Sequence, residues 1–408
     1  QVFFLQKNKE IFMNKKTFKD VDVTGKKVFV RVDFNVPLDE SNKIIDDTRI
    51  KAALPTITYL MHHGAKIILC SHLGRPNGMF NPKFSLAPVA KRLQELLNHP
   101  VKLASDAIGE SAIALTNEMK DGDIVMLENI RFYKEEEEND DEFAKKLASL
   151  ADIYINDAFG AAHRAHASTA GIARHLPAVA GFLMSKEIVS LSKVLYAAEP
   201  PVVVILGGAK ISDKIGVISK LIMKANVFLI GGAMANTFIV ARGGNVGLSR
   251  YEADKVDVAK KILEEAEKLN VKVLLPVDSV VANEFAPDAK AKTVDAYAVP
   301  EGFQGMDIGR KTTRMFVKEI KKAKTIIWNG PLGVYEFKRF QRGTKKIAKA
   351  VAKSNAVSVV GGGDSAAAIT ELGYASRVTH LSTGGGATLK FLEGAVLPGV
   401  EMLEDKDK

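Results

Sequence analysis

Three features of the sequence predict an α/β fold with two doubly wound, Rossmann-like parallel sheets. Short apolar runs typical of buried strands alternate with longer amphipathic runs typical of helices. This alternation occurs in two series along 408 residues, which is more chain than one hydrophobic core usually serves. Polar and glycine residues follow directly after most of the apolar runs, where open parallel sheets bind their ligands. We therefore expect two domains joined by a helix, with a cleft between them.

The first series of apolar runs lies before residue 160 and the second after residue 200. Strands are expected at residues 27–34, 65–71, 123–129, 151–158, 201–208, 225–232, 271–278, 324–330 and 356–363. Helical periodicity between them is clearest at residues 86–97, 141–150, 254–269 and 343–354. Strands that alternate with helices are typical of βαβ units, so both sheets should be parallel.

The segment "SKEIVSLSKVLYAAE" predicts a connecting helix between the two series. We expect Ser185 to be its N-cap and Glu187 to lie in its first turn, and the helix should end before Pro200. The expected organisation is an N-terminal extension at residues 1–12, a first domain at 13–184, the helix at 185–199, a second domain at 200–390, and a segment at 391–408 that returns to the first domain.

Composition narrows the class of protein. No apolar run approaches the roughly 20 residues of a membrane span, so no membrane partner is expected. Cys70 is the one cysteine; it should be a buried strand residue and not a nucleophile, and its isolation is typical of a reducing compartment. The formal net charge is +9, but the lysines are scattered along predicted helices and form no long basic run. We therefore expect no nucleic-acid partner.

Polar side chains follow the predicted strands and should gather at the sheet edges. They include Asp33, Asn35, Glu128, Asn129, Asn156, Asp157, Asp278 and Asn329. The first edge is also rich in cationic groups, namely Arg49, Arg75, Arg131, Arg164, His72, His163 and His166. A lone arginine is typical of a surface ion pair, but four of them indicate a small ligand with more than one anionic group. A metal site at the two histidines of "HRAH" would need a third ligand, which is absent at the usual spacing.

The second edge is rich in glycine, in "LGGAKISDKIG", "LIGG", "GGGDS" and "STGGGATLK". Glycine lets backbone N–H groups approach a ligand, and helix N-termini attract phosphate oxygens. Lys210 and Lys214, which we expect on successive turns of one helix start, would neutralise phosphates. Asp364 would suit Mg²⁺, which takes one or two carboxylates beside nucleotide phosphates. One glycine turn is typical of a tight loop, but four in one half of the chain indicate a nucleotide.

Two other classes of enzyme receive little support from the sequence. Gly361, Gly363 and Ala366 match a dinucleotide-binding fingerprint, but no carboxylate follows near residues 379–383, where that fold needs one. No nucleophile–base pair stands out either. Phosphoryl transfer depends mainly on positioning and charge neutralisation. A nucleotide edge and an anion edge on separate domains are therefore typical of a small-molecule kinase.

Eight segments together resemble the phosphoglycerate kinase family. In chain order they are "RVDFNVP", "SHLGRP", "LENIRF", "NDAFGAAHRAHAS", "LGGAKISDKI", "WNGPLGVYEF", "GGGDSAAA" and "HLSTGGGATLKFLEG". The resemblance implies reversible phosphoryl transfer between 1,3-bisphosphoglycerate and ADP, giving 3-phosphoglycerate and ATP, with Mg²⁺. It also implies a cytoplasmic monomer that closes around its ligands. Arg310, Ala233 and Ser365 depart from common forms of the motifs, and none of these changes removes a charged contact.

The resemblance implies specific roles for residues of this sequence. The phosphoglycerate would be bound by Asp33, Asn35, Arg49, His72, Arg75, Arg131, His163 and Arg164. The Mg-nucleotide would be bound by Lys210, Lys214, Gly231, Gly232, Met306, Asn329, Val334, Glu336, Gly362, Gly363, Asp364 and Ser365, with Asp364 on the metal. The transferring phosphoryl group would be served by Arg49, Lys210, Lys214, Gly361 and Gly384. The alternative is a non-catalytic nucleotide-binding module with a surface-binding role, which should have lost some of these charges.

Overall fold

The structure is a computed structural model, and it describes residues 14–406. The predicted extension at residues 1–12 lies outside this range. Within it the chain forms two compact units, residues 14–189 with 396–406, and residues 190–395. Each unit has its own sheet and its own hydrophobic core.

The first unit is built on a six-stranded parallel sheet in the order β3-β4-β2-β1-β5-β6. Its strands are β1 (Lys27–Arg31), β2 (Lys66–Cys70), β3 (Val101–Leu103), β4 (Ile124–Met126), β5 (Ile153–Asn156) and β6 (Ala178–Ala180). Its helices are α2 (Thr48–His62), α3 (Ala87–Leu97), α4 (Glu110–Asn117), α5 (Lys134–Glu138), α6 (Asp141–Ala148) and α15 (Pro398–Glu401). The central strands are buried on both faces, which explains their continuous apolar sequences.

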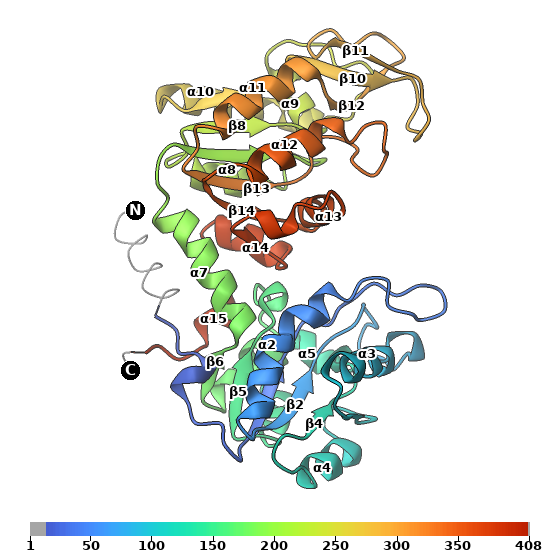
Figure 1. Ribbon diagram of the computed structural model, residues 1–408, viewed down its shortest axis with the longest axis vertical. Helices are drawn as coiled ribbons and strands as arrows, with labels where there is room; N and C mark the ends of the chain where they lie inside the picture. Colours follow the sequence, from blue (N-terminus) through green and yellow to red (C-terminus); the bar gives the residue numbers. More distant parts are fainter. Residues whose placement is uncertain (1–13, 407–408) are drawn as a thin grey trace. The chain divides into compact units, whose positions relative to one another are not determined.

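The C-terminal segment belongs to this first unit. Glu404 N donates to Ala178 O at 2.9 Å, and Lys15 Nζ donates to Leu403 O at 2.7 Å. Figure 1 shows α15 close to β6 of the same unit. The last residues of the described chain therefore complete the fold of the first ones.

Helix α7 (Phe182–Tyr196) connects the two units and begins three residues before the expected N-cap. Ser185 therefore lies inside the helix, so its predicted role as the N-cap is wrong. The free N–H groups of the first turn are bound instead by distant side chains. Thr56 Oγ1 accepts from Phe182 N at 3.0 Å, and Asp157 Oδ1 accepts from Met184 N at 3.1 Å. Such capping partners replace a local Ser or Thr.

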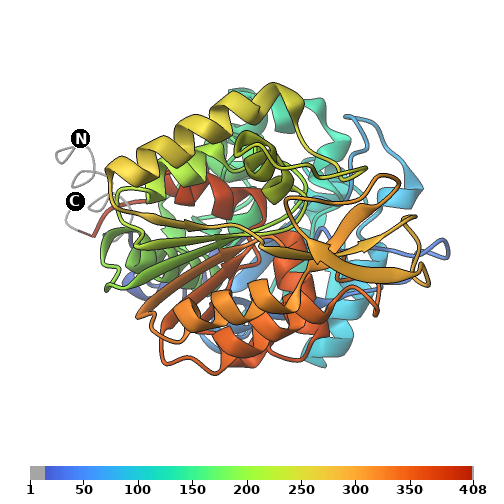
Figure 2. The ribbon, with the colours of Figure 1, turned by 90° about the horizontal axis from the view of Figure 1, so that it is seen from above.

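The second unit also contains a six-stranded parallel sheet, in the order β15-β14-β13-β7-β8-β9. Its strands are β7 (Val202–Leu206), β8 (Val227–Ile230), β9 (Lys272–Leu274), β13 (Thr325–Asn329), β14 (Val357–Gly361) and β15 (His380–Leu381). Its helices are α8 (Ile215–Leu221), α9 (Met234–Ala241), α10 (Val256–Lys268), α11 (Arg310–Ile320), α12 (Arg342–Ala352), α13 (Gly363–Glu371) and α14 (Gly386–Leu392). Figure 2 shows α10 and α11 on opposite faces of this sheet. The expectation of two parallel-sheet α/β domains is confirmed.

Helix α12 illustrates how the sequence pattern positions the helices. Its buried residues are Gly343, Thr344, Ile347, Ala348 and Val351, which repeat at helical spacing along one face. The lysines of "KKIAKAVAK" lie on the exposed side. This helix packs onto the core that contains Trp328 of β13.

A small antiparallel sheet in the second unit was not expected. Strands β10 (Asp278–Ala282), β11 (Ala291–Asp295) and β12 (Gln304–Ile308) pair in the order β11-β10-β12. Strand β11 has the sequence AKTVD and no residue of it is buried, so it lacks the apolar run that marked the predicted strands. This sheet matters for function because β10 and β12 contribute to the wall of a cavity.

Candidate active site

The first unit gathers cationic side chains around His72, just beyond the carboxyl end of β2. Burial holds the pKa of His72 well below its usual range, and neighbouring charges lower it further. The arginines that act on it are Arg31, Arg131 and Arg49. Because like charges are held close together here, an anionic ligand would be stabilised at this cluster.

Gly74 joins two of the predicted substrate residues. Its N–H donates to Asn35 Oδ1 at 2.9 Å, and its carbonyl accepts from Arg131 Nη1 at 2.9 Å. Arg131 is buried and also pairs through Nε with Glu137 at 3.2 Å. Loops that follow β1, β2 and β4 are therefore tied together by backbone and side-chain contacts at one sheet edge.

Arg49 lies on the first turn of α2 and faces Asp33. Its Nη1 donates to both carboxylate oxygens of Asp33 at 3.0 Å. Asp33 is buried, whereas the Arg49 side chain is 37% exposed. The guanidinium is thus anchored on one side and keeps its other donors open to a ligand.

The segment 163–166 adds the remaining cations. Arg164 Nε donates to His163 Nε2 at 3.2 Å. Burial lowers the pKa of His163, and the charge of Arg164 lowers it further. Because its pKa is lowered, the His163 ring is neutral at neutral pH, and its Nε2 can accept this hydrogen bond. Arg75 is exposed, and none of the described contacts ties it to the cluster.

Sequence reasoning missed Arg31, the most deeply buried residue of this cluster. Arg31, at the end of β1, is 1% exposed, and its Nε donates to Ser168 Oγ at 2.7 Å. Its Nη2 lies 3.2 Å from His72 Nδ1 and 4.0 Å from Glu136 Oε1. Although burial acts to raise the pKa of Glu136, the nearby His166 side chain, the Arg31 charge and hydrogen bonds from Ser168 lower it overall. A charged residue at the last position of a buried strand was the available signal.

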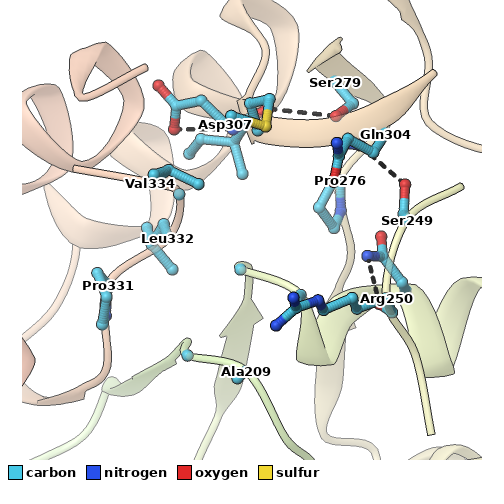
Figure 3. Close-up of a pocket in the computed structure, with 18 of the residues that line it drawn as sticks. Ala209, Ser249, Arg250, Pro276, Ser279, Gln304, Asp307, Pro331, Leu332 and Val334 are labelled. Atoms are coloured by element: carbon cyan, nitrogen blue, oxygen red, sulfur yellow. Dashed lines mark hydrogen bonds between the residues drawn. The ribbon is translucent and has the colours of Figure 1, made fainter. Parts of the chain in front are cut away.

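The second unit contains a cavity of about 280 Å³ at the carboxyl edge of its sheet. Figure 3 shows its walls, which come from the loop after β7, the segment after α9, strands β10 and β12, and the loop after β13. The predicted nucleotide residues that line it are Gly232, Met306, Val334, Glu336 and Asp364. Most other lining residues are apolar, and a mostly apolar slot with a few polar groups suits a nucleoside.

Other predicted nucleotide residues form a hydrogen-bonded row along the same edge. Lys214 Nζ donates to Asn329 Oδ1, and Asn329 Nδ2 donates to Gly361 O at 2.8 Å. Ser365 Oγ donates to Gly361 O at 2.7 Å and accepts from Gly330 N at 2.7 Å. Asn329 and Ser365 therefore hold the strand ends together, so their contacts in this structure are to the protein itself.

The two lysines of "GGAKISDKIG" lie in different surroundings. Helix α8 begins only at Ile215, so Lys210 lies in the preceding loop and Lys214 is the N-cap residue. The expectation that both lie on successive turns of one helix is wrong. Lys210 is exposed, while burial lowers the pKa of Lys214 against the opposing charges of Asp213 and Asp364.

Several positions at this edge of the sheet require glycine, because neighbouring atoms lie too close for a Cβ. A Cβ on Gly207 would lie 2.1 Å from Pro331 O, and one on Gly361 would lie 2.6 Å from Thr388 Cγ2. By contrast, Gly208 has φ +100° and a Cβ added there would meet nothing within 4 Å, so its backbone is open to the cavity it lines. Gly231 packs on Leu332, and Gly384 N donates to Ser382 Oγ at 3.2 Å.

Some polar residues at strand ends bind the backbone of other segments and so support the fold. Asp278 caps α11, because its carboxylate accepts from Lys311 N at 2.9 Å and Thr312 N at 2.8 Å. Glu128 accepts from Leu86 N at 2.8 Å at the start of α3. Asn156 Nδ2 donates to Gly399 O at 3.0 Å.

Asp307 lies in the cavity wall as a largely uncharged acid. Burial raises the pKa of its carboxyl to about 8, although its oxygens accept from Gly343 N at 2.7 Å and Ile308 N at 2.9 Å. At neutral pH the protonated form therefore predominates. The cavity wall therefore carries less negative charge than its three acids, Asp307, Glu336 and Asp364, would give it if all were ionised.

The carboxylate of Asp364 is the group in this unit that fits a nucleotide-bound cation. It is exposed on the first turn of α13 and lines the cavity. Residues 14–406 contain no group of three or more His, Cys, Asp or Glu side chains that could hold a metal by themselves. A cation at Asp364 would therefore take most of its ligands from phosphate and water, which is the usual manner of Mg²⁺.

A second groove, of about 490 Å³, lies between the ends of α11 and α12. Its cations are Lys321, Lys322, Lys324, Lys346, Lys349 and Lys353. Most lie at or beyond the final turns of the two helices. Cations at helix C-termini complement the partial negative charge of the helix ends, which explains their presence here.

Two expectations from composition can be compared with the structure. Cys70 is fully buried at the end of β2, and burial raises the pKa of its thiol to about 12, so the prediction that it is a strand residue is confirmed. No helix among residues 14–406 combines the length and the apolar character needed to cross a membrane.

The chain matches one family of known proteins over nearly its whole length. The phosphoglycerate kinase family model matches residues 18–395. The phosphoglycerate kinase of Dictyoglomus turgidum is 57% identical over 398 residues, covering 97% of this chain and 100% of the relative. That of Borrelia hermsii is 55% identical over 392 residues, covering 96% and 100%.

A solved structure has the same fold. Phosphoglycerate kinase from Coxiella burnetii superimposes with a TM-score of 0.86 at 40% identity, covering 95% of this chain and 98% of the other. The sequence matches and this structural match span both sheets and both groups of predicted ligand-binding residues. The chain therefore belongs to the phosphoglycerate kinase family.

Proposed function

We propose that the two units divide the reaction of this family between them. The chain is a phosphotransferase that moves a phosphoryl group reversibly between ATP and the carboxylate of 3-phosphoglycerate. In our proposal the cationic cluster of the first unit binds the phosphoglycerate, and the cavity of the second unit binds the nucleotide. One observation carries this division: the cationic cluster has more positive groups than acidic partners, while the cavity is apolar with a few acids.

Phosphoglycerate carries a phosphate and a carboxylate, so it needs two separated anion contacts. The arginines of the first unit would bind its phosphate, and Asp33 and Asn35 would bind its hydroxyl and orient the carboxylate. Arg49 would reach the transferring group, because its guanidinium is anchored by Asp33 and has donors free. Lys210 and Lys214 would neutralise the nucleotide phosphates from the other unit.

The nucleotide would lie with its base against Met306 and Val334 and its ribose at Glu336. Asp364 would hold Mg²⁺, which spreads the negative charge of the phosphates when it is bound. In the direction of ATP use, a carboxylate oxygen of 3-phosphoglycerate attacks the γ-phosphorus. The bond from that phosphorus to the bridging oxygen of ADP breaks, so the products are 1,3-bisphosphoglycerate and ADP. Lys214 lies near Asp364 and would stabilise charge on the group in transfer.

Direct transfer requires the two ligands to meet with water excluded. We therefore propose that the units close on each other once both ligands are bound. We also propose that the protein is a monomer and that it acts in the cytoplasm. In a monomer, the residues proposed to bind both ligands would all come from one chain. The support for the compartment is a single cysteine with no possible intramolecular disulfide.

A coupled assay of 3-phosphoglycerate with Mg-ATP, with and without EDTA, tests this function. We expect 1,3-bisphosphoglycerate to form only when both substrates and the cation are present. Calorimetry with Mg-ADP and with 3-phosphoglycerate should show one site for each ligand. Binding of the nucleotide without any transfer would instead support the non-catalytic module.

A further inference from the structure

Arg31 has a guanidinium group whose three nitrogens all contact the protein itself. Its Nε donates to Ser168 Oγ at 2.7 Å, and its Nη1 donates to the carbonyl of Val32. Its Nη2 lies 3.2 Å from Nδ1 of His72. Because the residue is 1% exposed and each nitrogen has a partner, Arg31 is not placed to bind phosphoglycerate directly.

The charge of Arg31 is held in place by the buried Glu136. Ser168 Oγ, which accepts from Arg31 Nε, donates to Glu136 Oε1 at 2.6 Å. The backbone N–H of Ser168 donates to the other carboxylate oxygen at 2.8 Å. A buried arginine needs such an acidic partner, since an unpaired charge in the interior is strongly destabilising. The guanidinium is therefore fixed by contacts that do not involve His72.

The contact between Arg31 and His72 determines which ring nitrogen of His72 carries a proton. A guanidinium has five donors and no acceptor, and it stays protonated. At 3.2 Å, His72 Nδ1 must therefore accept the hydrogen bond, so it carries no proton of its own. The proton of the neutral ring is then on Nε2. A doubly protonated ring would instead place two N–H groups and two positive charges against each other.

The surroundings of His72 favour the same neutral state. Burial is the main cause that lowers the pKa of this ring. The charges that act in the same direction are those of Arg31, Arg131, Arg49 and His166. They come from the end of β1, the segment after β4, the first turn of α2 and the segment 163–166.

The second ring nitrogen of His72 is available to a ligand. Among residues 14–406, Nε2 has no hydrogen-bond partner, and the residue keeps 6% of its surface exposed. A proton held on Nε2 gives the ring one hydrogen-bond donor at the cluster proposed to bind phosphoglycerate. A neutral donor of this kind does not depend on pH, whereas a cationic histidine would lose its charge as pH rises.

We propose that Arg31 is a positioning residue that holds His72 as a neutral imidazole with its proton on Nε2, so that His72 donates a hydrogen bond to phosphoglycerate and does not act as a cation. The state of the ring is a property of the free protein. Its use toward phosphoglycerate rests on the proposed function.

The state of the ring can be measured by two-bond ¹H–¹⁵N spectra of protein labelled with ¹⁵N-histidine. The chain has eight histidines, and loss of one pattern in His72→Asn identifies that of His72. We expect an unprotonated Nδ1 and a protonated Nε2, unchanged from pH 8 to pH 5.5. A proton on Nδ1, or a second proton gained within this range, would overturn the proposal whatever the activity of the enzyme.

The role of Arg31 is tested by the double variant Arg31→Met, Glu136→Gln, which removes the buried pair together and leaves no unpaired buried charge. His72 should gain its second proton at a pH higher by about one unit or more, the effect of removing a close like charge. Loss of the Glu136 charge alone would act in the opposite direction, so a rise reports on Arg31. Spectra of His72 that match the natural protein over the whole range would overturn the positioning role.

Arg242→Met is the matched control, since Arg242 is an exposed arginine at the end of α9 in the other unit. It should leave the His72 pattern unchanged. Thermal unfolding checks that each variant is folded.

Calorimetry of 3-phosphoglycerate between pH 8 and pH 5.5 tests the use of the ring. The phosphate of the ligand also titrates, so the affinity of the double variant is divided by that of the natural protein at each pH. This ratio should rise by about threefold or more as pH falls, because His72 becomes a cation only in the variant and a charged donor binds more strongly. A constant ratio would overturn the neutral donor. A natural protein that did not bind 3-phosphoglycerate would refute the proposed function and leave the spectroscopic result standing.

Discussion

At the scale of single residues, a substitution of Arg49 can show whether this residue acts in phosphoryl transfer or only in binding the substrate. Arg49→Ala should lower kcat by about 10³-fold or more, because an arginine that acts on transition-state charge has effects of that size in related phosphoryl transfers. The KM for 3-phosphoglycerate should change much less. Steady-state kinetics in both directions gives the two constants.

Arg174→Ala is a suitable control for Arg49, since Arg174 pairs with Asp141 at the start of α6 and makes no described hydrogen bond or ion pair with α2. It should leave both constants within about twofold, as expected of an exposed ion pair. If Arg49→Ala instead raised KM strongly and lowered kcat less than about tenfold, Arg49 would be a binding residue only.

Asp364 distinguishes the nucleotide site from the phosphoglycerate site. Asp364→Asn should weaken Mg-ADP binding by about tenfold, or about 1.4 kcal/mol, because it removes the hard carboxylate that the cation prefers. Binding of 3-phosphoglycerate should be unchanged. Calorimetry with each ligand measures this, and Asp254→Asn, at an exposed pair with Lys255, is the control. An equal loss for both ligands would assign Asp364 a structural role.

At the scale of elements, the buried Asp157 links β5 to the start of α7 and makes stability depend on pH. Burial raises the pKa of its carboxyl from 3.8 to about 6. Between these values the folded protein binds more protons than the unfolded chain, so the free energy of unfolding falls as pH rises. The stabilisation is fully present below about pH 4 and is lost through pH 6, by roughly 3 kcal/mol.

Asp157→Asn should remove this dependence, because the amide oxygen still accepts from Met184 N without ionising. Urea unfolding of both proteins at pH 4, 5, 6 and 7 measures the effect. The variant should gain stability relative to the natural protein as pH rises over this window. A difference that stays constant across the series would mean that Asp157 does not titrate there.

The turn after β7 depends on a glycine for packing between elements. Gly207→Ala should lower the free energy of unfolding by about 1–3 kcal/mol, the range for forced overpacking, since its Cβ would lie 2.1 Å from Pro331 O. Gly363→Ala is the control, because a Cβ there meets nothing within 4 Å. Chemical denaturation that finds the two variants equally stable would contradict the close approach.

At the scale of the whole molecule, the proposed closure of the two units on each other can be tested in solution. Small-angle scattering should give a smaller radius of gyration with 3-phosphoglycerate and a non-hydrolysable Mg-ATP analogue together than with either ligand alone or with none. Each single-ligand sample serves as a control. A radius that does not change in the ternary mixture would rule out closure as the step that excludes water.

The sequence alone predicted the fold class and the central strands of both parallel sheets, but not the short strands β3, β6 and β15 or the antiparallel sheet. This was possible because a strand buried on both faces requires a continuous apolar run, and ligand-binding residues follow such runs in parallel sheets. The amphipathic helices were equally clear, as the lysine-covered face of α12 shows. The resemblance added the roles of individual residues, which pattern and spacing could not supply.

Only the tertiary structure decided which polar residues at the sheet edges bind other segments of the fold. Asp278 and Asp157 follow strands just as Asp33 does, but their carboxylates bind the N–H groups of helices distant in sequence. The start of α7 could not be predicted for the same reason, since its partners Thr56 and Asp157 are far from it along the chain. Hydrogen bonds between distant segments leave no local pattern, so the sequence marks where polar groups occur and the fold determines what they bind.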